Sequence, residues 1–179
     1  MIRSRMARLA LLVVVGMTIG CDQVSKHFAA EHLMGVARQS FLGDTLRLEY
    51  AENAGAFLSL GAGLPQWART ALFSVGTAII LIGCVAVALR QRWRGLPLLG
   101  LALVWAGGIS NLVDRVARGS VIDFLNVGIG SIRTGIFNVA DMAIMMGVLL
   151  LLLHRGQVAD ESKDAAQPAD AAARPTADR

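Results

Sequence analysis

Four long apolar stretches constrain this chain most, because such segments must be either buried inside a protein or immersed in lipid. They cover residues 9–21 (extending to about Ser25), 70–89, 96–113 and 136–153. A stretch of about 20 apolar residues can cross the hydrocarbon core of a membrane as a helix. Backbone groups in lipid must be bonded within the chain, so we expect four transmembrane helices.

The composition agrees with a membrane protein. Apolar residues make up 55% and charged residues 17%, whereas a soluble domain carries about 25% charged residues. We expect one domain at residues 1–155 and, because residues 156–179 are rich in alanine, proline and charge, a disordered cytoplasmic tail. The net charge of +4 does not indicate a nucleic-acid partner, because the basic residues lie beside apolar stretches and form no single stripe.

The arginines predict the orientation. If four helices alternate, one side of the membrane receives Arg3, Arg5, Arg8, Arg90, Arg92, Arg94 and Arg155. Basic loops stay inside, so both termini should be cytoplasmic. The basic, apolar start also imitates a cleavable signal peptide, but cleavage would leave an odd number of crossings, and we expect it to be retained. The opposite loops contain Arg115, Arg118 and Arg133, which need another explanation.

The two outer loops carry strand signals. Residues 45–50 alternate between polar and apolar, and residues 52–55 follow as a turn signal. Residues 121–125 form a short apolar run that ends before Gly128 and Gly130. We therefore expect a small sheet at the outer ends of the helices. The expected fold class is an all-α integral membrane protein with four helices and this small β element.

Four aspartates lie near the ends of the apolar stretches, where acidic side chains are costly. Asp141 is five residues into the fourth stretch, about 7.5 Å below its start at 1.5 Å per residue, and Asp123 lies outside the third stretch on the same side. If they converge, the two carboxylates can share a proton and activate water without a metal. Asp22 precedes Lys26 by four residues, and Asp114 is adjacent to Arg115 and precedes Arg118 by four, so both favour structural ion pairs.

The pattern alone leaves other functions open. An intramembrane acid such as Asp141 also serves as the proton site of a small proton-coupled carrier, and all four acids could be pairing groups in a structural scaffold. A metal site is not expected, because His27, His32 and His154 lack ligand spacing. We also find no serine-nucleophile motif and no cofactor fingerprint.

Five short motifs resemble those of the bacterial lipoprotein signal peptidases (signal peptidase II), which are four-span intramembrane aspartyl peptidases. Residues 22–26 resemble DQxxK, residues 53–56 the start of NxGAAFS, residues 111–115 GNxxDR, residues 121–124 the segment of the first catalytic aspartate, and residues 137–141 FNxAD. Each motif is weak alone. Their order and their places relative to four apolar stretches make the resemblance specific, and it covers the chain from Leu9 to His154.

The resemblance implies an enzyme that removes the signal peptide from a diacylglyceryl-modified prolipoprotein, on the amino side of the lipidated cysteine. Asp123 and Asp141 would be catalytic and would activate water, with no metal or cofactor. The substrate would be bound by Asn53, Gly55, Asn111, Arg115 and Asn138. The supporting residues would be Asp22, Lys26 and Asp114.

The resemblance also implies a location and partners. The enzyme would lie in the bacterial inner membrane with its active site near the periplasmic face, in contact with membrane lipid. The outer strands would form a cradle over the lipidated peptide, and outer-loop arginines would hold the site. The cyclic-peptide inhibitor globomycin should bind, and we assume a monomer.

Two positions depart from the family pattern. Phe57 comes one place early after Asn53, so the loop over the substrate could pack differently. Ser110 stands where the family has glycine before Asn111, which questions a close backbone approach at that point.

Overall fold

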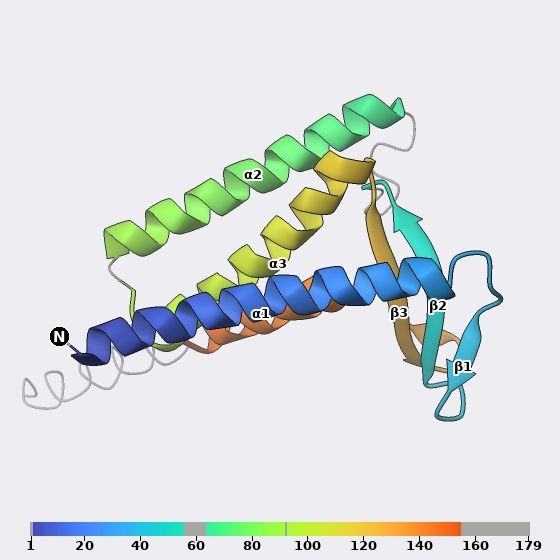
Figure 1. Cartoon of the computed structure of the whole chain (residues 1–179), viewed down its shortest axis with the longest axis horizontal. Helices are drawn as coiled ribbons and strands as arrows, with labels where there is room; N and C mark the ends of the chain where they lie inside the picture. The colour runs from blue at the N-terminus through green and yellow to red at the C-terminus, as the bar shows by residue number, and fades with distance from the viewer. Residues whose placement is uncertain (1, 56–63, 92, 155–179) are drawn as a thin grey trace, which may run out of the picture.

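Four helices account for most of the molecule. The computed structural model describes residues 2–55, 64–91 and 93–154. The helices are α1 (Ile2–His32), α2 (Gln66–Gln91), α3 (Leu96–Arg118) and a C-terminal helix (Val139–His154) (Figure 1). Three of them, α1 to α3, are long and apolar enough to cross a membrane, and the C-terminal helix is a shorter apolar one.

The apolar stretches predict these helices, although the boundaries differ. The first three stretches all lie inside longer helices, and α3 carries a proline, Pro97, in its first turn, where proline is tolerated. The fourth helix starts at Val139 instead of residue 136, because Phe137 is paired with Leu125 as a β-bridge. Hydropathy alone does not separate an apolar residue in a strand from one in a helix.

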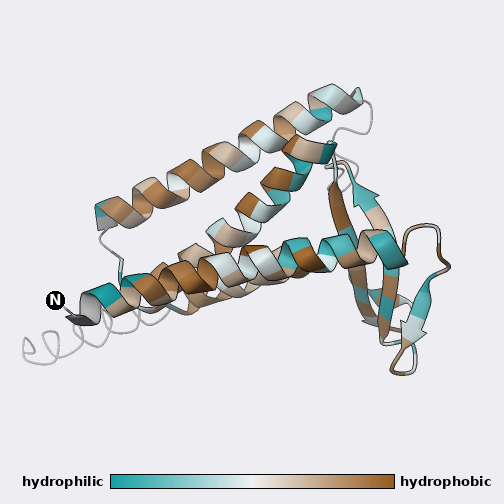
Figure 2. Ribbon diagram, in the orientation of Figure 1, coloured by the Kyte–Doolittle hydropathy of each residue, from teal (hydrophilic) through white to brown (hydrophobic). Residues whose placement is uncertain are grey.

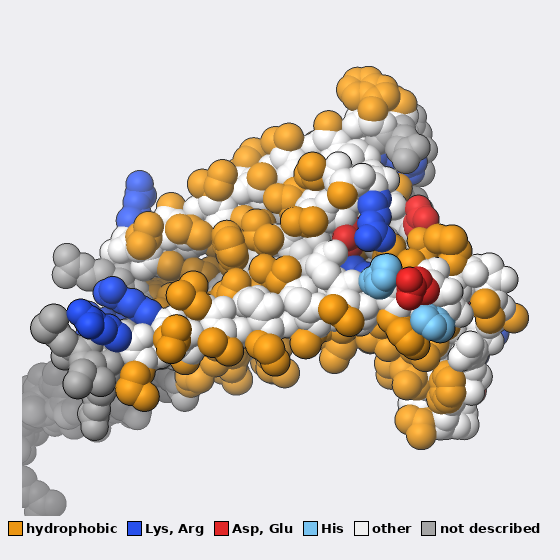
Figure 3. All heavy atoms as spheres, viewed as in Figure 1, with side chains coloured by type: hydrophobic (Ala, Val, Ile, Leu, Met, Phe, Trp, Pro, Cys, Tyr) orange, Lys and Arg blue, Asp and Glu red, His pale blue; other side chains and the backbone are white. Residues whose placement is uncertain are grey.

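The outer faces of the helices are apolar and exposed. Side chains such as Leu12 and Ile82 are 68% and 70% exposed. Figure 2 shows apolar residues along the lengths of α1, α2 and α3 and hydrophilic residues near the helix ends and on the sheet. Figure 3 shows Lys and Arg side chains around the first turns of α1. Such broad apolar faces mark a surface that lipid covers.

Glycines bring α3 close to the C-terminal helix. A Cβ at Gly100 would lie 2.8 Å from the carbonyl oxygen of Gly147, and a Cβ at Gly107 would overlap the carbonyl oxygen of Ala140. Such close approach is typical of helix pairs in membranes. On the other side, α3 meets α2, where Leu81 lies against Gly108. Helix α3 therefore packs on both α1 and α2 (Figure 1).

A four-stranded antiparallel sheet stands at the outer end of the helices. Its strands are β1 (Gln39–Phe41), β2 (Leu46–Asn53), β3 (Val121–Ile129) and β4 (Ile132–Arg133), in that spatial order. The expected sheet is thus confirmed. The turn expected to start at Glu52 begins later, because β2 continues to Asn53, which pairs with Val121. The register of this pairing shifts between Leu48 and Ala51.

The sheet is fixed to α1 by an apolar cluster. Ile122 and Phe124 on β3 pack against Ala29, in the last turn of α1, and against Leu33, which directly follows that helix. Side chains alternate across a strand, so this packing turns the intervening residue, Asp123, to the opposite face of the sheet. The placement of a catalytic candidate therefore follows from an ordinary alternation of apolar residues.

Arg133 ties the outer edge of the sheet together. It donates hydrogen bonds to the carbonyl oxygen of Asp44 at 2.6 Å and to Oδ1 of Asn126 at 2.5 Å. Asp44, in the β1–β2 turn, also accepts hydrogen bonds from Arg47 and Ser40, and the bond from Arg47 holds its pKa well below the usual range. None of these contacts involves a predicted site residue, so the role of outer-loop arginines in holding the site stays a prediction.

Candidate active site

Asp141 lies in the first turn of the C-terminal helix. Asn138 caps this helix: its Oδ1 accepts a hydrogen bond from the Asp141 amide at 2.9 Å, and its own amide donates to Asp141 Oδ2 at 3.1 Å. This reciprocal pair is a capping box. The expected depth of five residues into the helix is therefore wrong, because the helix begins at Val139 and Asp141 is its third residue. A helix N-terminus stabilises a negatively charged side chain.

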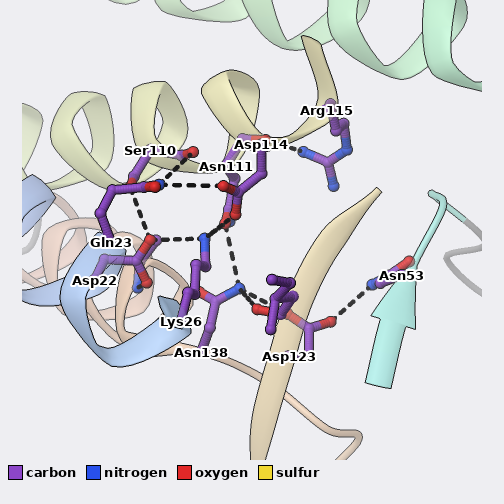
Figure 4. A network of polar contacts seen from close by, with 12 residues as sticks. Asp22, Gln23, Lys26, Asn53, Ser110, Asn111, Asp114, Arg115, Asp123 and Asn138 are labelled. Carbon is purple, nitrogen blue, oxygen red and sulfur yellow. Dashed lines mark hydrogen bonds and ion pairs between the residues drawn. The ribbon is translucent and has the colours of Figure 1, made fainter. Parts of the chain in front are cut away.

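Asp123 reaches the same place from strand β3. Its two carboxylate oxygens accept hydrogen bonds from Nδ2 of Asn138 at 2.6 Å and from Nδ2 of Asn53 at 3.1 Å (Figure 4). The pKa of Asp123 is raised to about 6: burial and the negative charge of Asp141 raise it, and the hydrogen bonds from the two asparagines and the charge of Lys26 partly oppose the rise. Asp123 is only 3% exposed.

Asn111 connects the two aspartates to each other. Its Nδ2 donates to Asp141 Oδ1 at 2.9 Å, and its Oδ1 accepts from Nδ2 of Asn138 at 3.2 Å. Asn138 in turn donates to Asp123. The carboxylates thus belong to one network supplied by β3, α3 and the start of the C-terminal helix, and Asn138 contacts both of them.

A buried ion cluster lies beneath this network. Nζ of Lys26 lies 2.6 Å from Oδ2 of Asp22 and 2.7 Å from Oδ2 of Asp114, and it donates to Oδ1 of Asn111 at 2.8 Å. Lys26 and Asp22 are both fully buried. The local pair of Asp22 with Lys26 is therefore confirmed. The expected pairing of Asp114 with its neighbour Arg115 is corrected, because the cation that faces Asp114 comes from α1.

Asp22 also fixes the position of the C-terminal helix. Its Oδ1 accepts a hydrogen bond from the amide of Ala140 at 2.7 Å, and its Oδ2 accepts one from the hydroxyl of Ser110 at 2.7 Å. Ala140 directly precedes Asp141, so α1 sets the height at which Asp141 sits. A carboxylate that binds an early helix amide satisfies one of the donors that a helix start leaves free.

Sequence reasoning missed two members of this cluster, Gln23 and Ser110. Nε2 of Gln23 donates to the hydroxyl of Ser110 at 2.9 Å and to Oδ1 of Asp114 at 3.2 Å. The signal for Gln23 was its place beside Asp22 in a helical segment. Ser110, noted as a departure from the family pattern, fills its position with a buried hydroxyl, and the close backbone approach is supplied by Gly107 instead.

The remaining two candidates border the network. Gly55 follows β2 at φ +96°, its amide donates to Oδ1 of Asn53 at 3.0 Å, and a side chain there would overlap the ring of Phe73 on α2. Arg115 makes a long, 3.5 Å hydrogen bond to the Asn111 carbonyl, and its charge acts on Asp123 and Asp141. Phe57, the other departure, lies outside the described residues.

The arrangement combines two acids with a rigid set of amide donors. Asp123 is buried and Asp141 is partly buried. Two carboxylates in one network disfavour double ionisation, so one of them can hold a proton while the other accepts one. Such a pair is suited to general acid–base attack by water.

Comparison with known proteins identifies the family. The sequence profile described as "Signal peptidase (SPase) II" matches residues 14–155. The chain belongs to the signal peptidase II family. It is 36% identical to the lipoprotein signal peptidase of Syntrophus aciditrophicus over 144 residues, which covers 79% of this chain and 89% of that protein. It is 39% identical to that of Hydrogenovibrio crunogenus over 149 residues, which covers 81% of each chain.

A solved structure shares the fold. A bacterial membrane enzyme determined by the in meso method at 1.9 Å resolution superposes with a TM-score of 0.71 at 26% identity, and the match covers 81% of this chain and 91% of that one. Membership of the signal peptidase II family, together with three long apolar helices, makes this chain a membrane peptidase of the lipoprotein-processing class.

Proposed function

We propose that this chain is an aspartyl endopeptidase that removes the signal peptide from diacylglyceryl-modified prolipoproteins, on the amino side of the lipidated cysteine. The observation that carries the proposal is the single network in which Asn138 and Asn111 join Asp123 to Asp141. Two carboxylates held this way need no metal or covalent intermediate to hydrolyse an amide.

The two aspartates have different surroundings, which supports different roles. Burial raises the pKa of Asp123 to about 6, which favours Asp123 as the member that holds the shared proton and donates it to the scissile carbonyl. Asp141 lies at the positive end of a helix dipole, which favours it as the base that deprotonates water. After attack, the proton taken by Asp141 is available to the leaving amine.

The substrate would lie between the sheet and the helices. Asn53, Gly55, Asn111, Arg115 and Asn138 border this space and would bind the peptide around the scissile bond, with the sheet as the cradle. Asp22, Lys26 and Asp114 hold the framework below and would not touch substrate. This division follows from the contacts, because Lys26 already pairs with both Asp22 and Asp114.

The membrane arrangement follows from the same residues. We propose four crossings, with the C-terminal helix as the fourth, both termini in the cytoplasm, and the site near the periplasmic face of the inner membrane. In support, Arg5, Arg8 and Arg90 lie at the helix ends opposite the sheet. Residues 1–155 would form the peptidase domain as a monomer, residues 156–179 a cytoplasmic tail, and globomycin would compete with substrate.

The test replaces each aspartate by asparagine. Asp123→Asn and Asp141→Asn are each expected to abolish cleavage of a lipidated precursor peptide in micelles, while thermal unfolding remains cooperative. Asp44→Asn, in a surface turn, is the matched control and should cleave normally. Normal turnover by either site variant refutes the aspartyl mechanism, and pH-dependent flux through vesicles without cleavage would favour the proton-coupled carrier.

A further inference from the structure

Three cavities lie along the α2–α3 interface, and the third of them also borders α1. The first, of about 650 Å³, lies near the active site and is lined by Trp67, Thr70, Ser74 and Arg115 among others. The second, of about 410 Å³, and the third, of about 230 Å³, lie further along the two helices and share Val85, Leu89 and Trp105 in their linings. We call this row of cavities the α2–α3 groove.

Helix periodicity explains why the three cavities are aligned. The lining residues on α2 are 67, 70, 71, 74, 78, 81, 82, 85, 86, 88 and 89, and most of them recur three or four positions apart. Residues at this spacing occupy one face of a helix. The facing residues of α3 follow the same rule, at 116, 115, 112, 109, 105, 102, 101 and 98. One stripe of each helix therefore borders the groove from its outer to its inner end.

The two ends of the α2–α3 groove differ in chemistry. At the outer end, Nε of Arg115 and the hydroxyl of Ser74 are buried and have no hydrogen-bond partner among the described residues. Buried donors of this kind are costly unless a partner arrives. Beyond Ser74, the second and third cavities are lined by apolar residues alone, counting Trp105 among them. The groove therefore fits a molecule with polar acceptors at one end and a hydrocarbon chain at the other.

Length and access also fit a lipid chain. From Ala78 to Leu89 the groove follows α2 for about 16 Å, at a rise of 1.5 Å per residue. One leaflet of the hydrocarbon core is about 15 Å deep, half of about 30 Å. Ile82 and Leu89, on the wall, are 70% and 74% exposed, so the groove is open to the surrounding lipid along its length. An acyl chain could enter sideways without leaving the membrane.

We infer that the α2–α3 groove binds one acyl chain of the substrate's diacylglyceryl group, with an ester carbonyl of that group accepting hydrogen bonds from Arg115 and Ser74. The inference rests on the proposed function and extends it to the part of the substrate beyond the peptide. It assigns chain-length selectivity to α2 residues that lie far from the aspartates. Arg115, close to both the groove and Asp141, then fixes the distance from the lipid anchor to the scissile bond.

The test compares two valines on α2 with nearly equal exposure. Val85, in the groove wall, is 40% exposed, and Val87, outside the three cavities, is 41% exposed. Purified full-length variants are assayed on two synthetic precursor peptides that differ only in the acyl chains, dipalmitoyl or dihexanoyl. We expect Val85→Phe to lower the dipalmitoyl-to-dihexanoyl ratio of kcat/KM about tenfold, the size of an ordinary overpacking effect, and Val87→Phe to leave the ratio at its wild-type value.

The outcomes separate this inference from the proposed function. If the wild-type enzyme cleaves neither peptide, both the proposed function and the groove assignment are refuted. Wild-type cleavage with an unchanged ratio in folded Val85→Phe overturns the groove assignment alone. If Val85→Phe does not fold, the inactive Asp141→Asn enzyme is photo-crosslinked to a precursor with a diazirine at the acyl terminus. Adducts on Val85 or Trp105 support the inference, and adducts confined to residues outside the three cavities overturn it.

Discussion

Replacing Gly107 by alanine tests how tightly α3 positions the catalytic helix. The missing side chain lets α3 approach Ala140, the residue before Asp141. A Cβ at Gly107 would lie 2.8 Å from Cγ1 of Ile144 and closer still to the carbonyl oxygen of Ala140. Ordinary contact begins at 3.4 Å, so the C-terminal helix must recede by at least about 0.6 Å.

The size of the effect follows from this displacement. A misplacement of about 1 Å in a catalytic group can lower activity about 100-fold. We therefore expect Gly107→Ala to lower kcat/KM by about 10- to 100-fold and to reduce the free energy of unfolding by about 1–3 kcal/mol. Initial rates on a lipidated precursor peptide in mixed micelles measure the first effect, and thermal unfolding in the same micelles measures the second.

The adjacent glycine gives a matched control. A Cβ at Gly108 would meet the end of the Leu81 side chain at 2.7 Å, which can rotate away, and not a backbone atom. Gly108→Ala should therefore retain most of the activity. At Gly83 nothing lies within 4 Å, so Gly83→Ala should be neutral in activity and gain about 0.5–1 kcal/mol from the better helix former. If Gly107→Ala cleaves as fast as Gly108→Ala, the close helix contact does not set the position of Asp141.

Three further predictions concern the ion cluster, the pH profile and the sheet. Lys26→Met leaves Asp22 and Asp114 buried without their cation and should cost about 3–5 kcal/mol in thermal unfolding; adding Asp114→Asn should recover part of that loss, and no recovery would contradict the pairing. The hydrogen bond from Asn53 lowers the pKa of Asp123, so Asn53→Leu should raise that pKa above its value of about 6. Because protonated Asp123 is the proposed acid, the fall of kcat/KM with rising pH should then move to higher pH, and a shift to lower pH would refute this role. Arg133→Ala removes the bonds to the Asp44 carbonyl and Asn126, which should cost about 1–3 kcal/mol locally; hydrogen exchange should quicken in residues 39–47 and not in α3.

The sequence predicted the helices and strands better than the residues at which they begin and end. Uniform apolar stretches identified all four helices, and polar–apolar alternation identified β2. The start of the C-terminal helix was placed too early, because Phe137 is apolar whether it pairs with Leu125 or begins a helix. A better signal was present: Asn138 and Asp141 have the spacing of a capping box.

The site residues could be listed from the sequence, but their partners could not. Local spacing correctly paired Asp22 with Lys26, since one helix turn separates them. It assigned Asp114 to Arg115, although the cation that Asp114 contacts is Lys26, 88 positions away by sequence number, on another helix. Contacts between helices depend on packing depth and glycine placement, which a single sequence does not display. The hydroxyl of Ser110 was hidden for the same reason.

The position of α2 has a consequence for how this molecule must be handled. Helix α2 packs along α3, while its backbone does not closely approach that of α1 within the described residues, and a cavity of about 230 Å³ lies among the three helices. Bilayer molecules must therefore complete the solvation of one whole flank of α2. The detergent or lipid chosen for purification therefore contacts this flank of α2 in place of a neighbouring helix. The tilt of α2 should be compared only between samples in the same lipid.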